Sequence, residues 1–219
     1  MWSHILRIVA LLYILYNKPE QCPLLEPDKW CECLVACVAM LYFIINLLDA
    51  VVQLLHENFF PCSCLFATLS GIFNWLAETA AYIALAIFFS NMYEEANAEM
   101  FFEALMLINP VLFVVSNFLL PCEDVEDTLQ KLSCFFSVVP ILWILYLGVM
   151  NCNAYIIAAV LVPLIVDAIC AFFPKVPFKG HWFLLAVTEA HLFFFCAVCM
   201  LLGGGGGDSS FDDMGQVDA

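Results

Sequence analysis

Two aspartates lie inside long apolar stretches of the chain, where a carboxylate is costly. Asp49 lies in the stretch from Cys31 to Leu55, and Asp167 in the stretch from Ala154 to Phe173. Each is the only carboxylate deep in its stretch, and no basic residue lies one helical turn away. A carboxylate near the middle of a membrane helix costs about 2.5–3.5 kcal/mol on insertion scales, so it usually has a function. General acid–base catalysis is one such function, and it needs one carboxyl protonated and a second one ionised.

Other polar residues share helix faces at related spacings. Asn46 precedes Asp49 by three residues, which places both on one helix face. Asn74, Glu78 and Tyr82 follow one another at intervals of four and form a second stripe. Asn74 and Glu78 are equally consistent with a structural hydrogen-bonding cluster inside a helix bundle.

The residue patterns exclude several classes of enzyme. Glu189 and His191 are two residues apart and point to different sides of a helix, so they cannot share a ligand. The chain has no His-Glu-x-x-His and no Gly-x-Ser-x-Gly motif, which excludes zincin peptidases and α/β-hydrolases. The pairs Cys31-Glu32-Cys33 and Cys62-Ser63-Cys64 lack the second pair or the histidines of a zinc site. We therefore expect neither a metal nor a cofactor.

The composition predicts an all-α, polytopic integral membrane protein. Hydrophobic residues make up 65% of the chain and charged residues 12%, and the mean hydropathy is +0.98. A soluble domain would have roughly a quarter charged residues. A helix of about 20 residues crosses a hydrocarbon layer of about 30 Å, and residues 1–202 contain about seven candidate segments. These are Ile8–Tyr16, Cys31–Leu55, Phe59–Phe89, Met100–Leu120, Thr128–Met150, Asn153–Phe173 and Trp182–Leu202.

The last part of the chain and the overall charge limit the partners. Residues 203–219 begin with five glycines and continue with aspartates, so we expect a flexible acidic tail. The net charge of −15 comes from 21 acidic and 6 basic residues. Nucleic acids and anionic lipid surfaces both require basic patches, so neither is an expected partner. The expected partner is the lipid bilayer.

Several short motifs follow one another in a recognisable order. Val166-Asp167 precedes the turn Pro174-Lys175-Val176-Pro177-Phe178-Lys179, and Ala190-His191 follows aromatic residues in the last apolar segment. Leu48-Asp49-Ala50 and Thr79-Ala80-Ala81-Tyr82 lie upstream. This order resembles the YhhN family of membrane proteins, which usually have eight helices and whose animal members are lysoplasmalogenases. The resemblance extends over residues 5 to 202 and rests on order and spacing.

The resemblance implies a reaction and a set of site residues. The family hydrolyses the vinyl ether bond of lysoplasmalogen to a fatty aldehyde and a glycerophospho-base. Protonation of the alkene carbon gives an oxocarbenium ion, which water then attacks. The logic resembles that of glycosidases, in which one carboxyl is protonated and the other ionised. On this interpretation Asp49 and Asp167 are the catalytic pair. The residues expected to orient water or the substrate head group are Asn46, Tyr82, His191 and Arg7, of which Arg7 matches the basic residue of an early family helix. The implied location is the endoplasmic reticulum membrane, if the protein is eukaryotic.

Two other hypotheses stand beside this one. Leu48, Thr79 and Val166 replace the glycine, histidine and serine of the family motifs, which favours a catalytically inactive scaffold or lipid-binding protein. A cation or proton pathway is the third hypothesis, and it would be lined by Asp49, Glu78, Asp167 and Glu189. Transporters often contain internal repeats, and we find none in this sequence.

Overall fold

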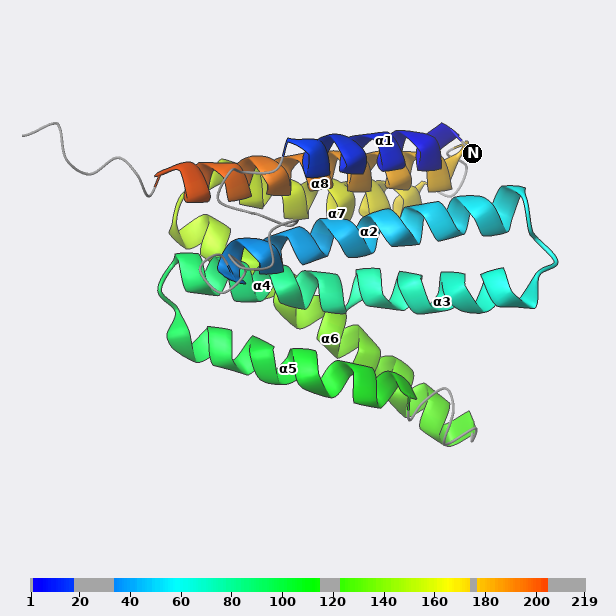
Figure 1. Cartoon of the computed structure of the whole chain (residues 1–219), viewed down its shortest axis with the longest axis horizontal. Coiled ribbons are helices and arrows are strands. Elements are labelled where there is room, and N and C mark those ends of the chain that lie inside the picture. The colour runs from blue at the N-terminus through cyan, green and yellow to red at the C-terminus, as the bar shows by residue number, and fades with distance from the viewer. Residues whose placement is uncertain (1, 18–33, 115–122, 174–176, 205–219) are drawn as a thin grey trace, which may run out of the picture.

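The computed structural model describes residues 2–17, 34–114, 123–173 and 177–204, and its regular elements in these ranges are all helices (Figure 1). They are α1 (Trp2–Tyr16), α2 (Leu34–Asn58), α3 (Cys64–Glu78), α4 (Ala80–Met92), α5 (Ala96–Val114), α6 (Glu123–Met150), α7 (Ala154–Phe172) and α8 (Lys179–Gly204). The predicted all-helical character is therefore confirmed for the described residues.

Where the structure describes them, the predicted apolar segments coincide with helices, but the third one is divided. Residues 31–33 and 115–120 of the predicted segments lie outside the described residues. A turn around Pro61 separates α2 from α3, and a break at Thr79 separates α3 from α4. At the break the hydroxyl of Thr79 donates to the Trp75 carbonyl (2.7 Å) and accepts from the Asn109 amide of α5 (2.9 Å). Thr79 and Asn109 are both buried. This hydrogen bond from a neighbouring helix is a long-range contact, which explains why the sequence did not indicate the break.

Helices α3 and α4 run in the same direction, one after the other; with these two taken as one broken helix, successive helices run in opposite directions along the bundle (Figure 1). Helix α1 packs against α2 and α8, while α7 packs against α8 and α6. Helices α2 and α4 pack against each other at the centre, and α5 and α6 both contact α4. The start of α1 and the end of α8 lie at opposite ends of the bundle (Figure 1).

Helix α4 forms the centre of the core. Its alanines are buried at positions 80, 81, 84 and 86, together with Phe88 and Phe89. Small side chains allow neighbouring helices to approach closely, which is how helices associate in membranes. Aromatic rings fill the remaining space, and the Tyr42 ring makes edge-on contacts with Phe43, Phe194 and Tyr82.

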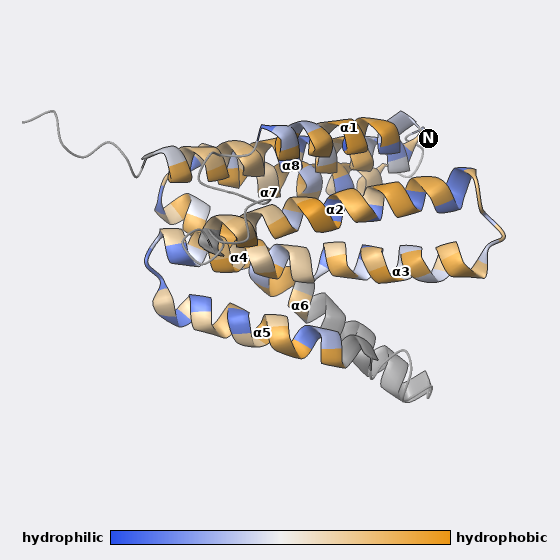
Figure 2. Cartoon of the chain, viewed as in Figure 1, coloured by the Kyte–Doolittle hydropathy of each residue, from blue (hydrophilic) through white to orange (hydrophobic). Residues whose placement is uncertain are grey.

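The outer surface of the bundle is apolar. Phe172 is 81% exposed and Leu107 is 76% exposed. Much of the length of α2 and α3 consists of hydrophobic residues (Figure 2). Within the part of the chain that the structure describes, four helical stretches are long and apolar enough to cross a membrane. They are Ala36–Asn58, Cys64–Met92, Ala154–Phe172 and Lys179–Gly203. Exposed apolar surface on this scale suits lipid as the surrounding solvent.

The predicted boundary of the tail requires adjustment. Helix α8 continues through Gly204, so residues 203 and 204 belong to the helix. Residues 205–219, the pair Cys31 and Cys33, and residues 174–176 of the proline turn lie outside the described residues.

The connection between α6 and α7 depends on a close helix contact. The side chain of Asn153 accepts hydrogen bonds from the Tyr155 and Ile156 amides, which caps the start of α7. The capped turn brings Ile156 against Gly148 of α6. A Cβ atom added at Gly148 would lie 2.7 Å from Cγ2 of Ile156. Only glycine fits there without displacing α7.

We predict that Gly148→Ala lowers the stability of the folded bundle by about 1–3 kcal/mol, since it overpacks a buried contact. The matched control is Gly71→Ala in α3, where an added Cβ meets nothing within 4 Å. Alanine is the better helix former by up to about 1 kcal/mol, so the control should be neutral or stabilising. Thermal unfolding in detergent micelles measures both. Equal effects of the two substitutions would contradict the proposed contact.

Candidate functional site

Helix α2 carries a polar stripe along an otherwise apolar helix. Tyr42, Asn46, Asp49, Gln53 and Glu57 follow one another at intervals of three or four residues, so they share one face. The first three are buried, Gln53 is half-buried and Glu57 is exposed. Asp49 lies near the middle of the apolar span Ala36–Asn58. The stripe therefore places polar groups where a membrane provides no water.

A buried arginine from α1, Arg7, makes hydrogen bonds with the middle of this stripe. Nη1 of Arg7 donates to Oδ2 of Asp49 at 2.9 Å, and Nη2 donates to Oδ1 of Asn46 at 2.8 Å. The side chains of Arg7 and Asp49 are only 5% and 2% exposed. Charges so far from water persist only when they are paired and hydrogen-bonded. The two residues therefore form one neutral, buried ion pair.

His191 of α8 accepts a further hydrogen bond from Arg7. Nε of Arg7 donates to Nε2 of His191 at 3.3 Å, and Nδ1 of His191 lies 2.9 Å from the Tyr42 hydroxyl. A guanidinium nitrogen can only donate, so Nε2 must carry a lone pair. The ring proton is then on Nδ1 and points at the Tyr42 oxygen. This contact requires a neutral imidazole, which positions the arginine without adding charge.

Both oxygens of the Asp49 carboxylate accept hydrogen bonds. Gln53 donates from Nε2 to Oδ1 at 2.8 Å, while Arg7 occupies Oδ2. Both oxygens act as acceptors, which is the arrangement of an ionised carboxylate. Asp49 in this geometry holds a negative charge and has no proton to donate.

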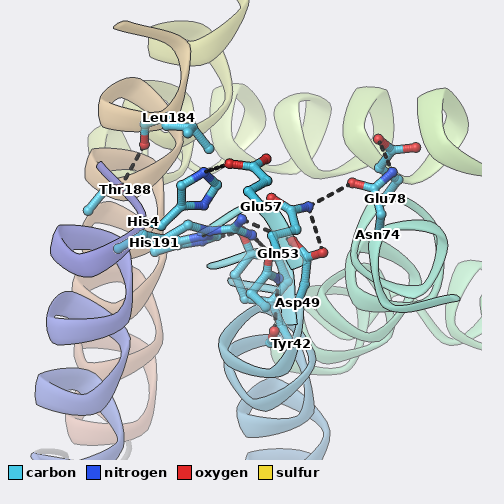
Figure 3. A network of polar contacts seen from close by, with 12 residues as sticks. His4, Tyr42, Asp49, Gln53, Glu57, Asn74, Glu78, Leu184, Thr188 and His191 are labelled. Atoms are coloured by element: carbon cyan, nitrogen blue, oxygen red, sulfur yellow. Dashed lines mark hydrogen bonds and ion pairs between the residues drawn. The ribbon is translucent and has the colours of Figure 1, made fainter. Parts of the chain in front are cut away.

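Polar contacts continue from Gln53 into α3 (Figure 3). The Gln53 amide also donates to Oδ1 of Asn74 at 3.2 Å, and the Asn74 amide donates to Oε1 of Glu78 at 3.0 Å. Glu78 is exposed. One chain of side chains thus connects the buried ion pair with a carboxyl at the surface of the bundle.

These groups line a partly open cavity of about 280 Å³. The residues of its wall are Arg7, Asn46, Asp49, Gln53, Asn74, Ala77, Glu78, Tyr82, Phe183, Leu184 and Val187. Its polar groups come from α1, α2, α3 and Tyr82 of α4, whereas its α8 wall is apolar. Glu78 and Phe183 are exposed and lie at the mouth. The cavity therefore suits a molecule that is polar at one end and apolar at the other.

The structure brings together most, but not all, of the residues singled out from the sequence. The wall of the cavity contains six of them: Arg7, Asn46, Asp49, Asn74, Glu78 and Tyr82. His191 lies behind Arg7 and does not line the cavity. Asp167 of α7 and Glu189 of α8 are exposed and do not line it either. The predicted partner of Asp49 is thus absent from this cavity.

Two participants were not singled out from the sequence. Gln53 follows Asp49 by four residues, and Tyr42 precedes Asn46 by four. Helical spacing alone would have placed both on the polar face. Both side chains are uncharged and therefore stand out less in an apolar helix than acids do, although Gln53 lies between the two carboxyl groups of the cavity wall.

Comparisons of the chain with protein-family models, with curated proteins and with solved structures gave no match.

We predict that the single substitutions Arg7→Met and Asp49→Asn each destabilise the bundle by about 3–5 kcal/mol, since each leaves one charge buried without its partner. The double variant Arg7→Met with Asp49→Asn should lose less than the sum of the two, because no unpaired charge remains. Unfolding in detergent by a chemical denaturant measures this cycle. Additive effects would show that the two residues are not coupled.

The matched control is the ion pair between His4 and Glu57, whose nitrogen and oxygen lie 3.1 Å apart at the end of the same helix pair. The Glu57 side chain is 53% exposed. Exposed pairs contribute only about 0–1 kcal/mol, so Glu57→Gln should have little effect.

Proposed function

We propose that the chain is a multi-pass membrane protein in which all seven predicted segments cross the bilayer, with α3 and α4 forming one broken span. Residues 1–202 then form the bundle in the membrane, and the acidic tail lies outside it. The alternating directions of the helices support this arrangement (Figure 1). The endoplasmic reticulum is the proposed membrane if the protein is eukaryotic.

An odd number of crossings places the two ends of the chain on opposite sides of the membrane. We predict that epitope tags at the two termini differ in their access to antibody or protease in sealed vesicles. Permeabilised vesicles are the control and should expose both tags. Equal access in sealed vesicles would mean an even number of crossings.

We propose, further, that the cavity around Arg7 and Asp49 hydrolyses the vinyl ether bond of a lysoplasmalogen. The observation that supports this proposal most is the composition of the cavity wall. Polar groups lie on one side, and Phe183, Leu184 and Val187 lie on the other. A vinyl ether is the junction between an apolar chain and a polar glycerol. The two sides of the cavity match the two sides of that bond.

The size of the cavity fits part of such a lipid. At about 30 Å³ per water, 280 Å³ equals about nine waters. This volume accepts a glycerol unit and the first atoms of the chain. The remainder of the chain stays in the bilayer, which it reaches through the open mouth.

The charges of the wall suit the chemistry as well. Protonation of the vinyl ether carbon produces a positively charged oxocarbenium ion. Fixed dipoles and charges around a water-poor site stabilise such an ion more strongly than water does. The ion pair of Asp49 with Arg7, which Gln53 also holds in place, provides a fixed dipole in the cavity wall. Tyr82 adds an aromatic face, which attracts cations.

One observation favours the alternative of a lipid-binding protein without chemistry. Both oxygens of Asp49 are occupied, and Asp167 does not line the cavity. The same cavity would then bind a lysolipid and release it unchanged. Activity distinguishes the two.

We predict that membranes containing the chain release fatty aldehyde from lysoplasmalogen, and that Val187→Trp abolishes the release by filling the cavity from its apolar side. Leu192→Trp is the matched control, because it enlarges the same helix at a partly exposed position outside the cavity wall. The saturated alkyl ether analogue should bind without being cleaved. An aldehyde-trapping assay measures the product.

The outcomes separate the candidates. Binding of both lipids without release would favour the inactive lipid-binding protein. Equal release by Val187→Trp and the native chain would place the reaction elsewhere. Loss of release in a folded Asp167→Asn variant would mean that Asp167 acts despite its position outside this cavity.

A further inference from the structure

We propose that Glu78 is the proton donor of this reaction, in place of a second aspartate. The inference rests on the proposed hydrolysis and names the acid that it requires. Three carboxyl groups are compared as proton donors, and they occupy different positions. Asp49 is buried in an ion pair, Asp167 lies outside the cavity, and Glu78 lines the cavity at its mouth.

The hydrogen bonds of the two cavity carboxyls divide the roles. Asp49 accepts at both oxygens, from Arg7 and from Gln53. Glu78 accepts at Oε1 only, from the Asn74 amide, and Oε2 has no hydrogen-bond partner among the described residues. A carboxyl group with one free oxygen can carry a proton and direct it to a ligand. Both oxygens of Asp49 already face donors of the protein.

Hydrogen-bonded side chains connect the two carboxyls and hold them in a defined arrangement. Gln53 donates to both Asp49 and Asn74, and Asn74 in turn donates to Glu78. The Asn74 amide holds Oε1, which leaves Oε2 free to face a ligand in the cavity. Glu78 is also exposed, so water can return the proton after each turnover.

The charge balance of the cavity favours this assignment. The charged side chains in its wall are Arg7, Asp49 and Glu78, and the phenol of Tyr82 is also ionisable. The charges of Arg7 and Asp49 balance each other as an ion pair, which suits an uncharged vinyl ether. Donation of the proton produces a carboxylate at the moment when the oxocarbenium ion forms. Opposite charges then appear side by side in a medium of low dielectric constant, where their attraction is strong.

The reaction balances with water as the only co-reactant. The proton of Glu78 forms a C–H bond at the outer alkene carbon, and the alkene electrons leave a cation shared by the ether carbon and oxygen. Water adds to that carbon, and its released proton returns to the Glu78 carboxylate. The resulting hemiacetal transfers its hydroxyl proton to the ether oxygen as the C–O bond breaks. The products are a fatty aldehyde and the glycerol hydroxyl.

The test compares aldehyde release by the native chain, Glu78→Gln and Glu78→Ala, all in membranes and checked for folding by thermal unfolding. Glu78→Gln keeps the shape of the side chain and should reduce the turnover rate by about 10²–10⁴-fold, as general acids usually contribute. Its affinity for the saturated ether analogue should stay close to native. Formate or acetate should restore part of the turnover of Glu78→Ala, because a small acid can enter the open cavity. The matched control is Glu103→Gln, which removes another exposed carboxyl from a helix without touching the cavity wall.

Each outcome decides the question. Loss in Glu78→Gln, with retained binding and with rescue of Glu78→Ala by formate, supports the assignment. Native turnover in Glu78→Gln overturns it and leaves the hydrolysis itself intact. Weakened binding without rescue by an added acid makes Glu78 a positioning residue and also overturns it. Failure of the native chain to release aldehyde, with folded protein, removes the proposed function and this inference together.

Discussion

The buried ion pair between Arg7 and Asp49 is the interaction on which the polar interior depends. A lone charge in the middle of an apolar bundle is strongly disfavoured, so each partner makes the other tolerable. Their contact also fixes α1 against α2, since Arg7 comes from the first helix. His191 adds α8 to the same arrangement by accepting a hydrogen bond from Arg7 at its neutral imidazole. The helices α1, α2 and α8 thus meet at one guanidinium group.

The polar chain that begins at this pair gives the site its asymmetry. At one end, Asp49 is buried and accepts hydrogen bonds at both oxygens. At the other end, Glu78 is exposed and accepts a hydrogen bond from the described residues at Oε1 only. The two carboxyls therefore differ in burial and in hydrogen bonding. The amides of Gln53 and Asn74 connect the two without adding charge.

The fold explains why such a site is accessible. Small residues in α4 allow the central helices to approach one another, so the core around α4 is closely packed. The helix is interrupted at Thr79, next to Glu78, and the buried hydrogen bond from Asn109 stabilises this interruption. Glu78 thus ends α3, and Tyr82 follows in α4, yet both line the cavity. The apolar wall from α8 closes the other side and continues into the outer surface that suits lipid.

The sequence by itself determined the helical segments and the faces within them. Apolar runs of about 20 residues are a local property, as is the spacing that places Asn46 with Asp49 and Asn74 with Glu78. Only the tertiary structure decided which faces meet. Arg7 and Asp49 are separated by 42 positions, and Arg7 and His191 by 184, so no local pattern relates them. The predicted pairing of Asp49 with Asp167 failed to appear at the cavity for the same reason. Periodicity shows which residues share a side of one helix, whereas the rotation and neighbours of that helix are set by packing with the whole bundle.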